Sequence, residues 1–180
     1  MYGPCDFEHA HWTSRLDHVA ARLPGSLTEE FCSMVWSESP IPTRAGVSPE
    51  ARGRRDRPAP DFNDPRQAFA FTQIANGTVL DAVYPSRDWP KVDPVRNISG
   101  SFPPTCIVHG TDDDLVPVGL SRGLYRELVA RGIRCLMLEI PGEGHTFAAT
   151  MAVDSTTWKI QRRGFDFLET FTKSPENSLN

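Results

Sequence analysis

Two stretches decide the fold of this chain, Thr105-Cys-Ile-Val-His-Gly-Thr-Asp-Asp-Asp-Leu-Val-Pro117 and Glu139-Ile-Pro-Gly-Glu-Gly-His-Thr-Phe147. In each, apolar residues typical of a buried strand lead into a polar loop, which carries Asp113 in the first stretch and His145 in the second. Groups that follow the strands of an open α/β sheet gather at its carboxyl edge. We therefore expect Asp113 and His145 to lie together there.

The second half of the chain has a βαβα pattern. Short apolar runs predict strands over 105–109 and 135–140, and helical periodicity predicts helices over 118–130 and 155–171. Continuous apolar runs are typical of strands covered on both faces. The fold class is therefore α/β, with a short parallel sheet and flanking helices. The stripes expected to face inward are Leu120, Leu124 and Leu128 on the first helix, and Phe165, Leu168 and Phe171 on the second.

The first half reads as helical and irregular. Residues 12–23 predict a helix that Pro24-Gly25 ends, and Ser26-Leu-Thr-Glu29 resembles a capping box that opens another. Prolines, glycines and arginines over 37–63 predict a long surface loop. Asp64-Pro65 predicts the start of a helix that ends at Asn76-Gly77. Residues 78–100 read as a connector, and the aromatic residues of this half predict either the wall of a pocket or a local core.

Composition sets bounds on function. With 180 residues, 23% charged and 39% hydrophobic, and a net charge of -4, the chain reads as a soluble globular domain without a nucleic-acid-binding footprint. The basic run over 52–57 reads as a solvated loop. No segment approaches the roughly 18 apolar residues of a membrane span, so we expect a cytoplasmic protein. The four cysteines lack CxxC spacing, which favours buried thiols over disulfides or a metal site.

A resemblance rests on these motifs. His109-Gly-Thr-Asp-Asp-Asp-Leu-Val-Pro117 and Pro141-Gly-Glu-Gly-His-Thr-Phe147 resemble the C-terminal half of the α/β-hydrolase fold, in its esterase-lipase group and prolyl-oligopeptidase-like branch. Met1-Tyr-Gly-Pro-Cys-Asp6 is similar to a segment that follows an earlier core strand in those enzymes. The resemblance implies that Asp113, rather than Asp112 or Asp114, is the acid of a Ser-Asp-His triad and that His145 is its base.

The same resemblance implies a domain organisation. Residues 1–7 would be the remnant of a core strand end, 8–100 a helical, cap-like insertion with its connector, 101–173 the C-terminal βαβα core, and 174–180 a tail. The first strand of that core would then present an unpaired edge, where self-association or a partner chain is expected.

Two parts of a hydrolase site are absent from these 180 residues. In the resembled enzymes the serine elbow and the oxyanion loop precede the acid in the chain. Gly119-Leu-Ser121-Arg-Gly123 matches the elbow's letters, but it follows Asp113, has no strand before it and lies within a predicted helix. We therefore read Ser121 as an exposed helix serine, and the chain as a truncated form that is inactive alone.

Other polar residues indicate less. Glu8-His9-Ala-His11 lacks a defined third ligand for a metal. His18 reads as a surface helix residue, whereas His109 is either a packed structural histidine or a group that tunes Asp113. Asp112 and Asp114 read as loop-capping or solvated carboxylates. No cofactor and no metal are expected, because acyl transfer by a triad needs only protein and water.

Three interpretations remain open. The chain is the C-terminal portion of a hydrolase for a carboxylic ester or another acyl substrate. Alternatively, it is a non-catalytic, hydrolase-like binding or scaffold protein that a partner chain completes. In the third interpretation it is a different α/β protein and the resemblance misleads.

Overall fold

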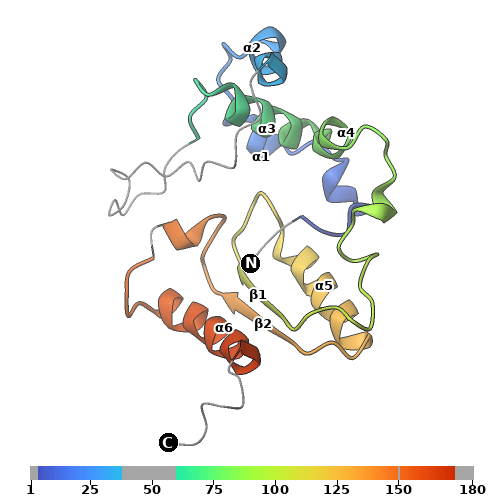
Figure 1. Cartoon of the computed structure of the whole chain (residues 1–180). Coiled ribbons are helices and arrows are strands. Elements are labelled where there is room, and N and C mark those ends of the chain that lie inside the picture. Colours follow the sequence, from blue (N-terminus) through green and yellow to red (C-terminus); the bar gives the residue numbers. More distant parts are fainter. Residues whose placement is uncertain (1–3, 38–59, 150, 173–180) are drawn as a thin grey trace, which may run out of the picture. The chain divides into compact units, whose positions relative to one another are not determined.

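The computed structural model describes residues 4–37, 60–149 and 151–172 (Figure 1). The chain divides into two compact units, one of residues 1–6 and 90–180 and the other of residues 7–89. Most of the predicted loop over 37–63, the basic run over 52–57 and the tail over 174–180 lie outside the described residues.

The unit of residues 7–89 is helical. Helix α3 (Pro65–Asn76) has the start and the end that the sequence predicts, because the Asp64 side chain accepts a hydrogen bond from the Arg66 amide and Gly77 ends the helix at φ +66°. A side chain at Gly77 would also lie 2.6 Å from the Ser14 carbonyl oxygen. The other described elements are η1 (Ala10–Trp12), α1 (Asp17–Ala20), α2 (Glu29–Ser33), η2 (Met34–Ser37), α4 (Val79–Val83) and, at the boundary, η4 (Trp89–Lys91).

Two expectations for the N-terminal helices were wrong. The helix predicted over 12–23 shrinks to α1, because the Leu16 amide donates to the Ala75 carbonyl at 2.8 Å and so ties the preceding residues to α3. The cap of α2 is Thr28, whose hydroxyl accepts from the Phe31 amide at 3.1 Å. Ser26 lies instead inside a turn that the Leu27 amide closes.

The sequence left open whether the aromatic residues of this unit form a local core or line a pocket, and some of them do each. Trp36 packs edge-on against Phe69 with ring centroids 5.3 Å apart, and Phe62 packs in the same way against Phe71 at 5.7 Å. Other rings line a pocket of about 240 Å³, whose lining is Trp12, Thr13, Gly77, Leu80, Asp81, Arg87 and Trp89.

The other unit contains the parallel sheet. Strands β1 (Thr105–Gly110) and β2 (Cys135–Ile140) pair in parallel, from Thr105 opposite Cys135 to Gly110 opposite Ile140. Helix α5 (Val118–Ala130) connects them, and η5 (Phe147–Ala149) and α6 (Thr156–Thr172) follow (Figure 1). The predicted βαβα order is confirmed, and the fold is α/β, with a short parallel sheet that has two strands among the described residues.

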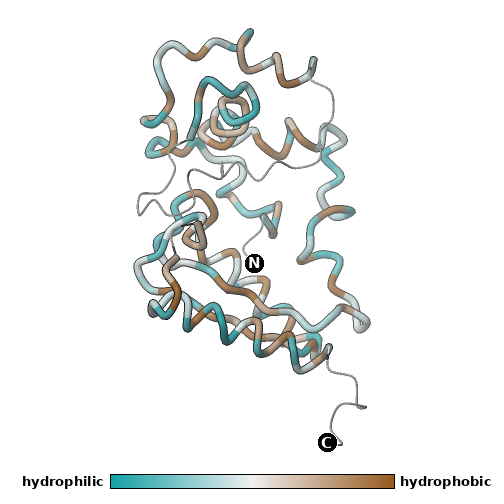
Figure 2. The backbone as a smooth tube through the Cα atoms, turned by 60° about the vertical axis from the view of Figure 1, so that its left-hand side comes forward, coloured by the Kyte–Doolittle hydropathy of each residue, from teal (hydrophilic) through white to brown (hydrophobic). Residues whose placement is uncertain are grey.

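Each face of the sheet has its own core. Alternate strand residues, Ile107 and Met137 among them, pack with Leu128 of α5, while Val108 and Leu138 pack with Ile160 of α6. Figure 2 shows how hydrophobic and hydrophilic residues are distributed along the backbone. Leu120 and Leu128 are buried and Leu124 packs beside them, so the predicted stripe of α5 is confirmed.

The predicted stripe of α6 was wrong in part. Phe165 and Leu168 are exposed, whereas Gly164 is buried against the sheet. A Cβ atom at Gly164 would lie 3.0 Å from the Cys106 sulfur and 3.2 Å from a Val108 methyl group. The helix therefore approaches the strands through its smallest residue, which turns the two larger apolar residues outward.

Residues 90–100, part of the predicted connector, group with the sheet. Asp93 is 1% exposed and accepts hydrogen bonds from the Asp6 amide at 2.9 Å and the Val95 amide at 3.0 Å. Ile98 joins the core on the α5 side. Buried Asp93 thus fastens the described N-terminal residues to this unit.

All four cysteines are free thiols; Cys5 and Cys32 are buried, as predicted, whereas Cys106 and Cys135 are only partly buried. Cys5 donates to the Leu120 carbonyl oxygen at 3.6 Å, and burial, aided by the charges of Asp93 and Asp6, raises its pKa to about 12. Among the described helices, none combines the length and the apolar character needed to cross a membrane.

Candidate active site

Asp113 lies in the loop between β1 and α5, and its carboxylate holds that loop in shape. The Oδ1 atom accepts hydrogen bonds from the Leu115 amide at 3.0 Å and the Val116 amide at 2.9 Å. Only 1% of the side chain is exposed. The loop therefore folds around the carboxylate and fixes its direction.

His145 lies in the loop after β2, as predicted. Phe147 anchors this loop, because its ring is buried in the core on the α6 side of the sheet. The backbone between them is unusual, since Thr146 has φ +60°, a region that non-glycine residues seldom occupy. The imidazole is 29% exposed, so it stands where the protein interior meets solvent.

The structure brings the two predicted site residues together. The Nδ1 atom of His145 lies 2.9 Å from Oδ2 of Asp113 and 3.2 Å from Oδ1. A carboxylate can only accept, so Nδ1 carries the proton that it donates. With Nδ1 bound in this way, the imidazole can take up a further proton only at Nε2.

The two loops are also joined by hydrogen bonds of their backbone amides. The Asp112 amide donates to the Glu143 carbonyl at 2.9 Å, and the Gly142 amide donates to the Thr111 hydroxyl at 2.9 Å. Gly110 makes this approach feasible, because a Cβ atom there would lie 2.2 Å from the Glu143 carbonyl oxygen. The absence of a side chain at Gly110 therefore lets the Asp113 loop and the His145 loop lie close together.

Asp113 remains ionised in this setting. Burial alone would raise its pKa, but hydrogen bonds from His109, His145 and the Val116 amide, together with the charge of His145, outweigh burial and hold the pKa well below its usual range. A stable anion beside Nδ1 stabilises the imidazolium that forms when Nε2 takes a proton. The ionised carboxylate and the imidazole thus form a hydrogen-bonded pair in which a positive charge on the ring would be stabilised.

His109 and Ser121 complete the surroundings of Asp113. His109, at 0% exposure, lies with Nε2 3.2 Å from Asp113 Oδ2 and 2.8 Å from the Val116 carbonyl oxygen, and with Nδ1 2.6 Å from the Ser121 hydroxyl. The expectation that Ser121 is exposed was wrong, since it is 2% exposed within α5. Its spacing of three and seven residues from Leu124 and Leu128 was the signal for burial.

The remaining polar candidates have local roles. The His9 Nδ1 atom accepts from the His11 amide and caps η1, and His18 is exposed. Asp112 accepts from the Thr111 hydroxyl at 2.9 Å. Among the described residues, no group of three or more His, Cys, Asp or Glu side chains is arranged to hold a metal ion.

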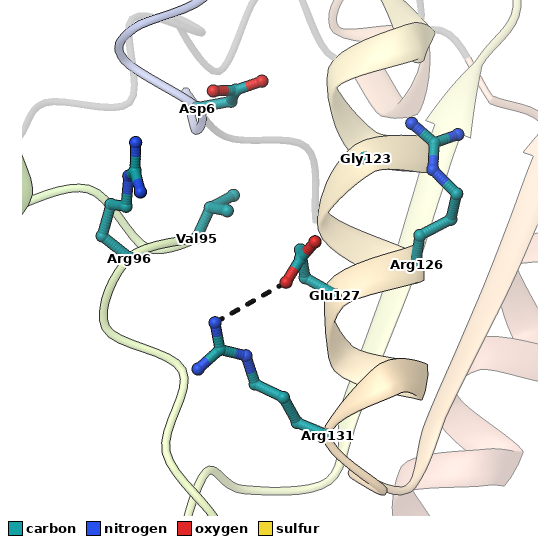
Figure 3. Close-up of a pocket in the computed structure, with 7 residues that line it drawn as sticks. All are labelled: Asp6, Val95, Arg96, Gly123, Arg126, Glu127 and Arg131. Atoms are coloured by element: carbon teal, nitrogen blue, oxygen red, sulfur yellow. Dashed lines mark ion pairs between the residues drawn. The ribbon is translucent and has the colours of Figure 1, made fainter.

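A separate pocket of about 310 Å³ is lined in part by residues of α5. Figure 3 shows Glu127 and Arg131 in this pocket pointing toward each other, with a nitrogen-oxygen distance of 3.6 Å. The Arg131 guanidinium also donates to the Ile98 carbonyl oxygen at 2.7 Å. Neither Asp113 nor His145 belongs to the lining, which is Asp6, Val95, Arg96, Gly123, Arg126, Glu127 and Arg131.

Two curated relatives are polyketide synthases. Non-reducing polyketide synthase pkbA of Emericella nidulans is 27% identical over 130 residues, which are 72% of this chain and 4% of that protein. Non-reducing polyketide synthase Preu6 of Preussia isomera is 35% identical over 72 residues, which are 39% of this chain and 3% of that protein. The chain thus spans a few per cent of the length of these relatives. No solved structure gives a significant match.

A family comparison covers more than half of the chain. Residues 69–174 match the prolyl oligopeptidase family, and this range includes both strands, the helices α5 and α6, and the Asp113 and His145 loops. The match agrees with the order of elements and with the α/β fold. The chain belongs to the prolyl oligopeptidase family.

Proposed function

We propose that this chain supplies the acid and the general base of an acyl hydrolase. Asp113 is the acid, His145 is the base, and the nucleophilic serine comes from outside the 180 residues. The observation that carries the proposal is the 2.9 Å distance between His145 Nδ1 and Asp113 Oδ2, next to the carboxyl ends of two parallel strands. Family membership supports it, because the family has a hydrolase-type fold.

In this mechanism His145 moves protons and Asp113 holds it in place. As the serine oxygen attacks the acyl carbon, its proton passes to Nε2 of His145, and Asp113 stabilises the imidazolium. The proton then goes to the departing alcohol or thiol, which leaves an acyl-enzyme. Water attacks that intermediate, gives a proton to Nε2 and releases the acid, after which the serine recovers its proton.

The substrate class proposed is a carboxylic ester or another acyl compound. Both relatives are named as polyketide synthases, so a polyketide is one acyl compound that we include in this class. We expect the chain by itself to be inactive. Ser121 is buried and its hydroxyl faces His109, so it cannot act as the nucleophile for His145.

The test is an ester hydrolysis assay on a protein that contains this chain and an upstream segment with a Gly-x-Ser-x-Gly elbow. We expect it to hydrolyse a short p-nitrophenyl ester. His145→Ala should lower turnover by about 10⁶-fold and Asp113→Asn by about 10⁴-fold, as in well-studied serine proteases.

His18→Ala is the matched control, because it removes an exposed histidine from the other unit. Full turnover by His145→Ala would contradict the proposal. So would hydrolysis by the 180-residue chain alone that Ser121→Ala abolishes. A folded, elbow-containing protein that hydrolyses no ester or thioester would instead favour a non-catalytic binding protein.

A further inference from the structure

We infer that His109 and Ser121 are positioning residues, which form a buried hydrogen-bond chain that orients Asp113 toward His145 and so fixes the tautomer of His145. The inference rests on the proposed function only in the roles given to Asp113 and His145. Ser121 is thus a supporting residue and not a nucleophile, although it matches the letters of an elbow.

The contacts of His109 determine where its protons are. Its Nε2 atom faces two acceptors, the Val116 carbonyl oxygen at 2.8 Å and Asp113 Oδ2 at 3.2 Å. Neither can donate, so Nε2 carries a hydrogen. In the neutral ring Nδ1 then accepts, and the Ser121 hydroxyl, 2.6 Å away, is its donor. The chain of donors therefore runs from Ser121 through His109 to Asp113.

The hydrogen bonds from Ser121 and His109 reach one oxygen of the Asp113 carboxylate, and backbone amides hold the other. Backbone amides of Leu115 and Val116 hold Oδ1, whereas His109 holds Oδ2 on the side toward α5. With both oxygens held, the carboxylate cannot rotate about its last bond without breaking hydrogen bonds. Oδ2 therefore keeps facing Nδ1 of His145, and Nδ1 keeps its proton.

Burial makes the hydrogen bonds among Ser121, His109 and Asp113 costly to break. His109, Ser121 and Asp113 are 0%, 2% and 6% exposed, so water does not replace a lost partner easily. A buried polar group that loses its partner carries the full cost of its desolvation. Burial also rules out attack by Ser121 on a substrate. The order of contacts differs from that of a triad as well, because here serine meets Nδ1 and aspartate meets Nε2.

The experiment observes the histidine rings of the folded 180-residue chain by ¹⁵N NMR at a pH of about 8.5, where an ordinary imidazole is neutral. In the unmodified chain His145 should be almost entirely the Nδ1–H tautomer. His109→Leu should lower the ratio of Nδ1–H to Nε2–H at His145 by roughly tenfold, the effect of losing one hydrogen bond to a charged group. Ser121→Ala should allow His109 to adopt either tautomer, and it should lower the ratio of Nδ1–H to Nε2–H at His145 by less than His109→Leu does.

Two variants separate positioning from general stability. His109→Gln keeps a donor for Asp113 and should restore the His145 ratio. Ser155→Ala removes the hydroxyl that accepts from the Trp158 amide at the start of α6, so it should weaken folding and leave the ratio unchanged.

An unchanged His145 tautomer in folded Ser121→Ala and His109→Leu overturns the inference, and so does failure of His109→Gln to restore it. If His109→Leu does not fold, Ser121→Ala decides alone. The readout needs no turnover, so a protein without esterase activity can still show the tautomer change. In that case the proposed function fails and the hydrogen-bond chain stands.

Discussion

At the scale of single residues, the Asp113 carboxylate is held by His109, by the Val116 amide and by His145. Asp113 and His145 could be placed because strand periodicity and loop length bring both to one sheet edge. The partnership of Ser121 with His109 is a contact across twelve residues that depends on how α5 packs. No local pattern reports such packing, although helical spacing does report that Ser121 faces inward.

Acid should weaken the folded state through Asp113. Its pKa is lower folded than the value of about 4 that an unfolded aspartate has. The contribution to stability is therefore full above pH about 4 and is lost as the pH falls toward the folded pKa. Urea unfolding at a series of pH values should show the gap between wild type and Asp113→Asn narrowing below pH about 4.

Asp154→Asn provides the control, because Asp154 is an exposed carboxylate of the same unit and already has φ +64°. It should follow the wild-type curve. A gap between wild type and Asp113→Asn that stays constant down to pH about 2 would contradict this account of Asp113.

At the scale of elements, prediction worked where the pattern was local. The bounds of β1, α5 and β2 follow from short apolar runs and from a leucine stripe. The helix predicted over 12–23 was wrong because a contact with a distant segment decides where it begins: the Leu16 amide donates to a carbonyl of α3. It also failed at α6, because Gly164 and not the aromatic residues meets the sheet.

Strand β1 should show alternating amide exchange. The Thr105 amide donates to the carbonyl of Arg134, directly before β2, and the Thr111 amide donates to that of Ile140 in β2. In a parallel pair, the amides of alternate residues point to the same side. Ile107 and His109 should therefore exchange slowly, whereas Cys106 and Val108 should exchange faster in a dilute chain. Residue-resolved hydrogen exchange measures this, and equal protection along β1 in a monomer would count against it.

At the scale of the whole molecule, the described residues build a sheet of two strands. Parallel sheets normally contain more strands and bury both faces. We propose that the outer edge of β1 takes up another strand, either from a second copy of this chain or from the segment that carries the serine.

Self-association should therefore rise with concentration when the 180-residue chain is alone. Sedimentation analysis should show dimers or larger species at micromolar concentrations, and joining the chain to the upstream segment should reduce them. A monomer at every concentration, with a sharp cooperative thermal transition, would argue that the edge needs no partner. Slow exchange at Cys106 and Val108 in the associated form would locate the contact at β1.

The hydrogen bonds around Asp113 also bear on how a working site would come together. Its loop, the His145 loop and Gly110 fix the proposed acid and the proposed base relative to each other within this unit. The entropy of ordering these groups is thus lost when this unit folds and not at each catalytic cycle. A serine docked at the sheet edge would meet a preorganised base, so small errors in docking, and not disorder of the histidine, would limit the rate.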